Sequence, residues 1–319
     1  MQSLLDRKLL FITGKGGVGK TTMAAAIGLA AARAGRRTIV VEVGQQNRLT
    51  GMFGLPEAQP GVERRLEPRL SSISIDPDRA LLEWLQALGG RVSGRILASS
   101  GTFQYFAAAA PGARELVSMV KIWQLTRSGR GRGSGGYDLV VVDAPATGHA
   151  LGLLRSPQTF GAIARVGPIA GHTKQVQELL SDPAASAYVA VALGSEMAVS
   201  EALELQSALD AQLGRSLETV IVNGLLPRRF TAAELTRIDA RSRNGHASPK
   251  RGSGGQRDGV AQAAARAAHA AHERSRLQHN QVARLRRRSF EVLPMPFVWG
   301  SHLDLAALED ISKRLSRKL

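Results

Sequence analysis

The chain has 319 residues, 44% of them hydrophobic, and a formal net charge of +16 at pH 7. This length can bury the core of one large domain, so we expect a single domain over residues 1–319. The absence of cysteine excludes disulfides, iron–sulfur ligation and thiolate metal sites. The sequence shows neither a signal-peptide pattern nor an uncharged run of membrane-spanning length, so we expect a cytoplasmic protein.

The positive charge is concentrated in one part of the chain. Residues 228–290 hold 15 Lys and Arg against 4 Asp and Glu, which is +11 of the total of +16. Such a block would attract polyanions or an anionic membrane surface. It is also typical of solvated, arginine-rich helices beside a disordered loop. The second interpretation is favoured, because residues 242–259 are too polar and glycine-rich to pack.

A phosphate-binding loop is indicated at residues 14–21, Gly-Lys-Gly-Gly-Val-Gly-Lys-Thr. Glycines let the backbone turn and present its N–H groups to phosphate, and the N-terminus of the following helix adds partial positive charge. Lys20 would reach the β- and γ-phosphates and Thr21 would hold Mg²⁺. The predicted nucleotide-binding residues of this loop are Gly14, Lys15, Gly16, Gly17, Val18, Gly19, Lys20, Thr21 and Thr22.

The segments around this loop predict a parallel α/β sheet. A strand at 8–13, a helix at 21–34 and a strand at 37–43 form a βαβ unit. The loop lies at the carboxyl end of its first strand, where open sheets bind ligands. Further strands are predicted at 70–75, 137–143, 188–193, 220–223 and 290–294. We expect a P-loop fold with seven or eight mostly parallel strands and helices on both faces.

A helical insertion is predicted over residues 77–127, with parts of 150–185. Its first helix begins at Asp76-Pro77, an N-cap followed by proline, and has an apolar face made by Leu81, Leu82, Leu85 and Leu88. Its second helix has an apolar face made by Leu116, Met119, Val120 and Trp123. Residues 128–136 are predicted to be a flexible connector.

An acidic residue, Asp143, ends the apolar strand at 137–143. A carboxylate at the tip of a central strand is placed to hold Mg²⁺, as a Walker B aspartate does. Asp143 is therefore predicted to join Thr21 at the metal. The residues Ala-Pro-Ala-Thr-Gly-His at 144–149 follow it directly.

Five ordered motifs between about residues 8 and 315 resemble those of one ATPase family. Lys15, directly after the first glycine, resembles the deviant Walker A lysine of SIMIBI NTPases. Residues 143–149 resemble switch II of the arsenite-pump (ArsA) and tail-anchored-protein-targeting ATPases, and residues 194–201 and 220–227 resemble further segments of the same family. The chain is identified as a divergent, bacterial-type member of this family, ahead of the MinD and ParA families.

The resemblance implies an ATPase that binds ATP and Mg²⁺ and works as a nucleotide-switched dimer. Lys15 would cross the dimer interface to the partner's nucleotide. Asn223 would read adenine, since an amide can pair with the adenine edge through two hydrogen bonds; it is otherwise a turn former at the end of a strand. Pro294, with Met295 to Phe297 after it, would lie at the adenine-side loop.

The sequence departs from the family in switch I. Gly44 stands where the family has an aspartate that positions the attacking water. Phosphoryl transfer depends mainly on positioning and charge stabilisation, so this loss predicts slow hydrolysis with intact ATP·Mg²⁺ binding. Glu42 lies two residues earlier on the same face of the strand and is the candidate replacement, although from a different depth. The predicted catalytic residues are Lys15, Lys20 and Glu42.

The sequence does not identify the partner of the dimer or its client. The dimer would be a homodimer or a heterodimer with an ArsA-like paralogue, and the chain either a weak ATPase or a non-hydrolysing regulatory subunit. Without cysteine a thiolate arsenite site and a CxxC zinc clasp are both excluded. A hydrophobic or membrane-protein client would need an apolar groove such as Leu116, Val120 and Trp123, for which core packing is the alternative.

Two other functions are disfavoured. A ParA- or MinD-like nucleic-acid or membrane-surface ATPase would use the basic block 228–290, but those residues surround a predicted loop. Metal binding by His269, His272 and His279 is disfavoured because they lie on an alanine- and arginine-rich helix that reads as exposed.

Overall fold

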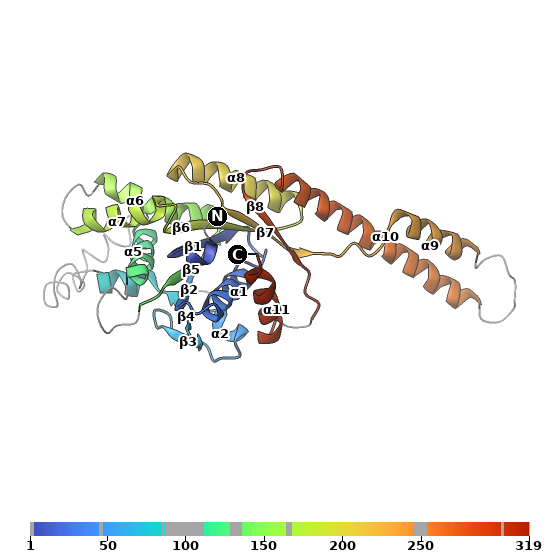
Figure 1. The fold of residues 1–319 in the computed structure, drawn as a ribbon, viewed down its shortest axis with the longest axis horizontal. Helices are drawn as coiled ribbons and strands as arrows, with labels where there is room; N and C mark the ends of the chain where they lie inside the picture. Colours follow the sequence, from blue (N-terminus) through green and yellow to red (C-terminus); the bar gives the residue numbers. More distant parts are fainter. Residues whose placement is uncertain are drawn as a thin grey trace.

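The chain folds around an eight-stranded sheet in the part that the structure describes (Figure 1). This computed structural model describes residues 3–44, 47–84, 86, 112–127, 136–163, 168–244, 254–300 and 303–318. The strands are β1 (Leu9–Gly14), β2 (Thr38–Val43), β3 (Arg64–Glu67), β4 (Leu70–Ile75), β5 (Leu139–Ala146), β6 (Ser186–Leu193), β7 (Thr219–Leu225) and β8 (Glu291–Pro296).

The sheet is mostly parallel, as predicted. Its order is β3-β4-β2-β5-β1-β6-β7-β8, and only the β3–β4 pair is antiparallel. β1 lies between β5 and β6, with later strands on both sides of it. Ligands of open α/β sheets bind where the strand order diverges in this way, at the carboxyl ends of the strands. The sequence analysis missed β3, because the short polar run Arg-Arg-Leu-Glu lacks the apolar pattern of a strand.

The central strands are buried because helices cover both faces of the sheet. Every residue of β1 is buried, and so are the first six of β5, which begin with the apolar run Leu-Val-Val-Val. Such continuous apolar runs are typical of parallel strands covered on both sides. Figure 1 shows α1 and α11 together on one side of the sheet and α6 and α8 on the other.

The helices connect these strands. They are the 3-10 helix η1 (Leu4–Asp6) and the α-helices α1 (Lys20–Arg33), α2 (Leu49–Met52), α5 (Ala113–Arg127), α6 (Thr147–Ile163), α7 (Pro168–Ser181), α8 (Glu196–Leu213), α9 (Ala232–Asn244), α10 (Gly254–Leu285) and α11 (Leu305–Ser316). A further helix covers residues 77–84. In Figure 1, α9 and the long α10 lie side by side and project away from the sheet. Among the described residues, every helix is too short or too polar to cross a membrane.

The helix at 77–84 begins as predicted but buries a different face. Asp76 Oδ1 accepts hydrogen bonds from the backbone N–H groups of Asp78 and Arg79, at 3.0 and 3.3 Å, which confirms the N-cap. Leu82 is 40% exposed, so its placement on the apolar face was wrong. The buried residues are Ala80 and Trp84, whose indole Nε1 donates to His172 Nδ1 at 2.8 Å. Leu85 and Leu88 lie outside the described residues.

The apolar face predicted for α5 is confirmed as core. Leu116, Met119, Val120 and Trp123 are all buried, and α5 packs against α6 and α7. Leu116, Val120 and Trp123 are therefore not a client groove in this structure. Residues 87–111 lie outside the described residues, so the extent of the insertion over 77–127 stays a prediction.

Two predicted loops fall largely outside the described residues. The connector at 128–136 is described only at Gly136. The loop predicted at 242–259 is helical at both ends, because α9 continues to Asn244 and α10 begins at Gly254. Residues 245–253 lie outside the described residues.

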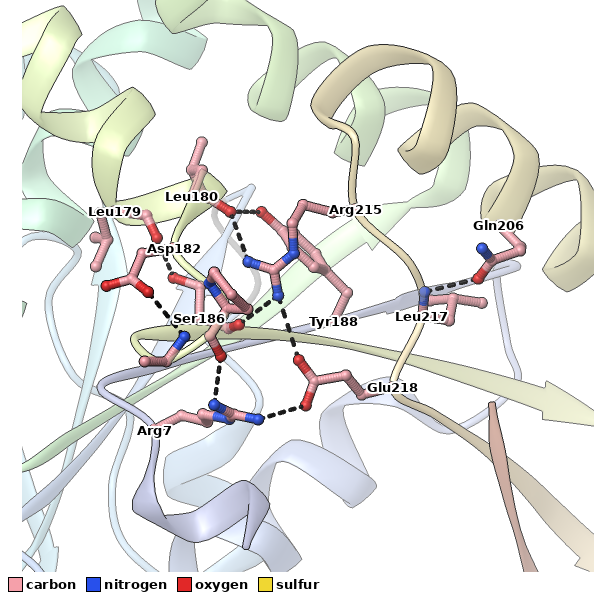
Figure 2. Close-up of polar contacts among 12 residues, drawn as sticks. Arg7, Leu179, Leu180, Asp182, Ser186, Tyr188, Gln206, Arg215, Leu217 and Glu218 are labelled. Atoms are coloured by element: carbon pink, nitrogen blue, oxygen red, sulfur yellow. Dashed lines mark hydrogen bonds and ion pairs between the residues drawn. The ribbon is translucent and has the colours of Figure 1, made fainter. Parts of the chain in front are cut away.

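An ion-pair cluster joins the segment before β7 to the segment before β1. Glu218 pairs with Arg215 at 3.3 Å through one oxygen and with Arg7 at 3.2 Å through the other. Figure 2 shows both guanidinium groups turned toward Glu218. Arg215 also donates to Ser186 O at 2.8 Å and lies over the ring of Tyr188. One carboxylate therefore balances two largely buried charges.

Replacing this carboxylate by a neutral amide should destabilise the fold. We expect Glu218→Gln to lower the free energy of unfolding by about 2 kcal/mol, because two partly buried arginines lose their counter-charge. Urea unfolding measures the change. Glu204→Gln, on the exposed face of α8, is the matched control and should change stability by less than about 0.5 kcal/mol. Equal losses in the two variants would contradict the assignment.

Candidate phosphate and nucleotide site

The phosphate loop lies between β1 and α1 and needs glycine at two positions for steric reasons. Gly14, Gly17 and Gly19 have φ angles of 145°, 78° and 95°, which L side chains rarely adopt. A side chain at Gly14 would clash with the carbonyl oxygen of Val191, and one at Gly19 with the amide of Asn223. The loop is thus packed against the ends of β6 and β7, with α1 beginning directly after Gly19.

Lys20 lies at the first position of α1, with its ammonium over the loop. Its Nζ donates to the carbonyl oxygen of Lys15 at 2.9 Å. Burial lowers the pKa of Lys20, whereas the carboxylates of Asp143 and Glu201 act in the opposite direction. The Lys20 ammonium, which is predicted to bind phosphate, therefore contacts the backbone of the phosphate loop in this structure.

Thr21 and Asp143, the predicted Mg²⁺ residues, are in contact. Thr21 Oγ1 donates to Asp143 Oδ2 at 2.6 Å. Asp143 is 6% exposed, and its other oxygen, Oδ1, is buried without a hydrogen-bond partner among the described residues. Burial raises the pKa of Asp143, while the bond from Thr21 and the charge of Lys20 lower it.

These groups fit the metal that the sequence predicts. Mg²⁺ prefers oxygen ligands and is usually held by one or two carboxylates together with water and substrate phosphates. A buried carboxylate oxygen without a partner, next to a threonine hydroxyl, supplies such ligands. One detail differs from the prediction: Asp143 does not end its strand, because β5 continues to Ala146.

Glu42 holds the beginning of α2. It lies opposite Asp143 in the β2–β5 register and is 2% exposed. Its Oε1 accepts hydrogen bonds from the backbone N–H groups of Arg48 at 2.8 Å and Leu49 at 3.3 Å. Burial raises the pKa of Glu42 to about 7, the two backbone bonds oppose the shift, and the charge of Asp143 adds to it.

Gly44 occupies a backbone conformation that disfavours other residues. Its φ angle is 106°, although a side chain there would meet nothing within 4 Å. An aspartate at this position would therefore have room but would strain the backbone.

Lys15 is paired within its own chain. Its Nζ lies 3.5 Å from Glu201 Oε2 of α8, and its side chain is 37% exposed. The sequence analysis did not identify Glu201 as a site residue, although it lies in the recognised segment 194–201.

A cavity of about 760 Å³ opens beside the phosphate loop. Asn223 lines it, and its Nδ2 donates to the carbonyl oxygen of Val18 at 2.9 Å, which ties β7 to the loop. Pro294 is not among the lining residues; it lies within β8 opposite Val222, whereas Phe297 and Val298 line the cavity. The predicted loop at 295–297 therefore contributes only its last residue, since β8 continues to Pro296.

The three histidines of α10 have separate partners. His269 Nε2 contacts Asp239, His272 Nδ1 contacts the carbonyl oxygen of Phe230, and His279 Nδ1 contacts the carbonyl oxygen of Ser275. Within the described part of the chain, no group of three or more His, Asp or Glu could hold a metal ion.

A phosphate loop between β1 and α1, with an acid on the adjacent parallel strand, defines an α/β P-loop nucleoside triphosphatase fold. Residues 7–166 match the model of the anion-transporting ATPase family. ATPase BagA of Mycobacterium tuberculosis is 30% identical over 238 residues, which cover 72% of this chain and 68% of that protein. ATPase GET3 of Paracoccidioides lutzii is 30% identical over 165 residues, which cover 49% and 46%. The chain belongs to the anion-transporting (ArsA) ATPase family.

The shifted pKa of Glu42 predicts a pH-dependent stability without nucleotide or metal. The folded chain keeps a proton on Glu42 up to about pH 7, whereas the unfolded chain releases it near 4.5. This stabilisation is complete below pH 4.5 and is lost as the pH rises through 7. At about 1.4 kcal/mol per pKa unit, it amounts to about 3 kcal/mol.

Glu42→Gln cannot titrate and should remove this dependence, while its amide oxygen still accepts the two backbone bonds. Urea unfolding in EDTA at pH 5 and pH 8 measures it: relative to the wild type, the variant should be more stable at pH 8 than at pH 5 by about 2 to 3 kcal/mol. Glu204→Gln serves as the control and should follow the wild type. A constant difference between Glu42→Gln and the wild type would refute the shift.

Proposed function

We propose that this protein is a cytoplasmic, nucleotide-switched dimeric ATPase subunit that binds ATP with Mg²⁺, hydrolyses it slowly alone and couples its nucleotide state to a client or partner. The supporting observation is the contact of Thr21 with a buried Asp143 whose second oxygen has no partner among the described residues, beside the ammonium of Lys20. Family membership supports the ATPase part of this proposal.

The binding roles follow from the positions of these groups. The N–H groups of residues 16–21 and the N-terminus of α1 would bind the phosphates, together with Lys20. Lys20 donates to Lys15 O in this structure, so phosphate binding exchanges that acceptor for an anionic one. Thr21 and Asp143 would hold Mg²⁺, which neutralises phosphate charge when bound.

Slow hydrolysis is inferred from switch I. Gly44 has no side chain to orient a water, and its positive φ disfavours an aspartate. Glu42, the candidate replacement, uses Oε1 to hold Arg48 and Leu49 and is almost fully buried. It is therefore better placed to fix the start of α2 than to activate a water. A non-hydrolysing subunit beside an active paralogue is the second candidate, favoured by the same glycine.

The dimer part of the proposal is based on Lys15. This lysine is partly exposed and pairs with Glu201 in its own chain at 3.5 Å, a distance and exposure at which an ion pair contributes little. It can exchange this partner for the nucleotide of a second subunit at small cost. The partner is a second copy or an ArsA-like paralogue.

Removing the ammonium group that is proposed to bind phosphate should strongly weaken nucleotide binding. We expect Lys20→Ala to weaken Mg·ATP binding by at least about 100-fold, because it removes a charge-assisted contact in a partly buried site. Isothermal titration calorimetry with and without Mg²⁺ measures it, and Lys174→Ala on α7 is the control. Wild-type protein without magnesium-dependent ATP affinity, or equal binding by Lys20→Ala, would overturn the proposal.

The purified chain alone should hydrolyse ATP slowly even at saturating Mg·ATP. The rate of phosphate release measures turnover. A slow enzyme releases phosphate without a partner, whereas a non-hydrolysing subunit does so only when an active paralogue is added. A fast rate that Glu42→Gln does not change would contradict the inference from switch I.

ATP should promote dimer formation through Lys15. We expect Lys15→Ala to bind Mg·ATP as a monomer and to lose ATP-dependent association in sedimentation-velocity runs. Glu201→Gln frees Lys15 from its partner in the chain and should keep or strengthen that association. Undiminished association of Lys15→Ala would exclude its role across the interface.

A further inference from the structure

One face of α10 forms a wall of the cavity beside the phosphate loop. Arg274, Leu277, Gln278 and Gln281 line the cavity, and their spacing of i, i+3, i+4 and i+7 places them on one side of the helix. The other walls come from the phosphate loop, from the carboxyl ends of β6 and β7, from the segments after β6, β7 and β8, and from α11. In Figure 1, α10 leaves the sheet beside these strands. A helix outside the recognised motifs therefore encloses the candidate nucleotide site.

Gln278 fixes α10 against the end of β7 and the residue that follows it. Its Oε1 accepts a hydrogen bond from the backbone N–H of Leu226 at 2.8 Å, and its Nε2 donates to the carbonyl oxygen of Gly224 at 3.3 Å. Ser275 Oγ donates to the carbonyl oxygen of Leu226 at 3.2 Å. Because both ends of the Gln278 amide are paired, the position of the next turn of α10 is set relative to the cavity.

Gln281, on that next turn, differs from Gln278. Its Oε1 is buried but has no hydrogen-bond partner among the described residues. Buried side-chain oxygens are normally paired, so an exception that lines a cavity indicates a missing ligand group. The side chain belongs to the cavity wall and not to the packed core.

The rest of the cavity suits a planar aromatic ring. Leu193, Leu226, Leu277, Phe297 and Val298 supply apolar walls, whereas the phosphate loop borders one end. A nucleotide whose phosphates bind the loop would place its base among these side chains. Asn223 also lines the cavity, but its Nδ2 is already engaged by Val18 O.

We propose that Gln281 hydrogen-bonds the base of the bound nucleotide and selects adenine over guanine; this rests on the proposed nucleotide function. A side-chain amide presents a donor and an acceptor side by side. On the edge that carries N7, adenine matches it with its 6-amino donor and N7 acceptor, whereas guanine presents two acceptors there, O6 and N7. In this pairing the unpaired Oε1 would accept from the 6-amino group and Nε2 would donate to N7.

The test compares ATP and GTP binding by calorimetry in Mg²⁺. Wild-type protein should prefer ATP. Gln281→Leu should weaken ATP binding about tenfold and leave GTP binding nearly unchanged, which is the size expected for one amide–base pair. Asn280→Leu is the control, since it also replaces an amide by leucine, at an exposed residue of α10 outside the cavity lining, and should keep the preference.

Gln281→Arg provides a second, opposite test. Arginine offers only donors, which match O6 and N7 of guanine, so the preference should shift toward GTP. If Gln281→Leu melts at a lower temperature than the control, its weaker ATP binding could come from lost stability. The ATP-to-GTP preference of Gln281→Arg then tests the role of Gln281. An unchanged ATP-to-GTP ratio in both variants, with ATP still bound, would refute the role of Gln281 and leave the proposed function standing. Absence of ATP binding by the wild type would refute both.

Discussion

The hydrogen bond between Thr21 and Asp143 is the contact on which the geometry of the candidate site depends. It joins the start of α1 to the central strand β5 at 2.6 Å. It requires β1 and β5 to be neighbours in a register that places Ile12 opposite Asp143. Slipping one strand by a single residue would turn Asp143 to the opposite face of the sheet. The buried, largely apolar strands hold this register, so packing of the core positions the polar groups of the site.

The same register gives Glu42 its environment. Glu42 lies opposite Asp143 on β2, so two carboxyl groups share a buried position on adjacent strands. Burial and the charge of Asp143 favour the protonated form of Glu42, which reduces their mutual repulsion, whereas the two backbone hydrogen bonds from the start of α2 favour the ionised form. The start of α2 is thus connected to the candidate metal site through one side chain.

At the other side of the phosphate loop, α10 links the sheet to a part of the fold that the motifs do not describe. Through Gln278 this helix is bonded to the end of β7 and the residue that follows it, and the same helix continues away from the sheet beside α9. One face of α10 therefore lines the cavity, while another part of the same helix packs against α9.

The sequence by itself determined the phosphate loop, the mostly parallel sheet, the acid on β5 and the family, because these depend on local spacing and on apolar runs that act within a few residues. It also placed the apolar face of α5 correctly. It missed β3 and the burial of Trp84 in place of Leu82, because an edge strand and a helix face are decided by what packs against them. Only the tertiary structure decided that Glu42 anchors α2, that Lys15 pairs with Glu201, and that Gln281 reaches the cavity while Pro294 does not. Each of these is a contact between segments far apart in the chain, and the spacing of residues along a sequence carries no information about which distant segment lies opposite.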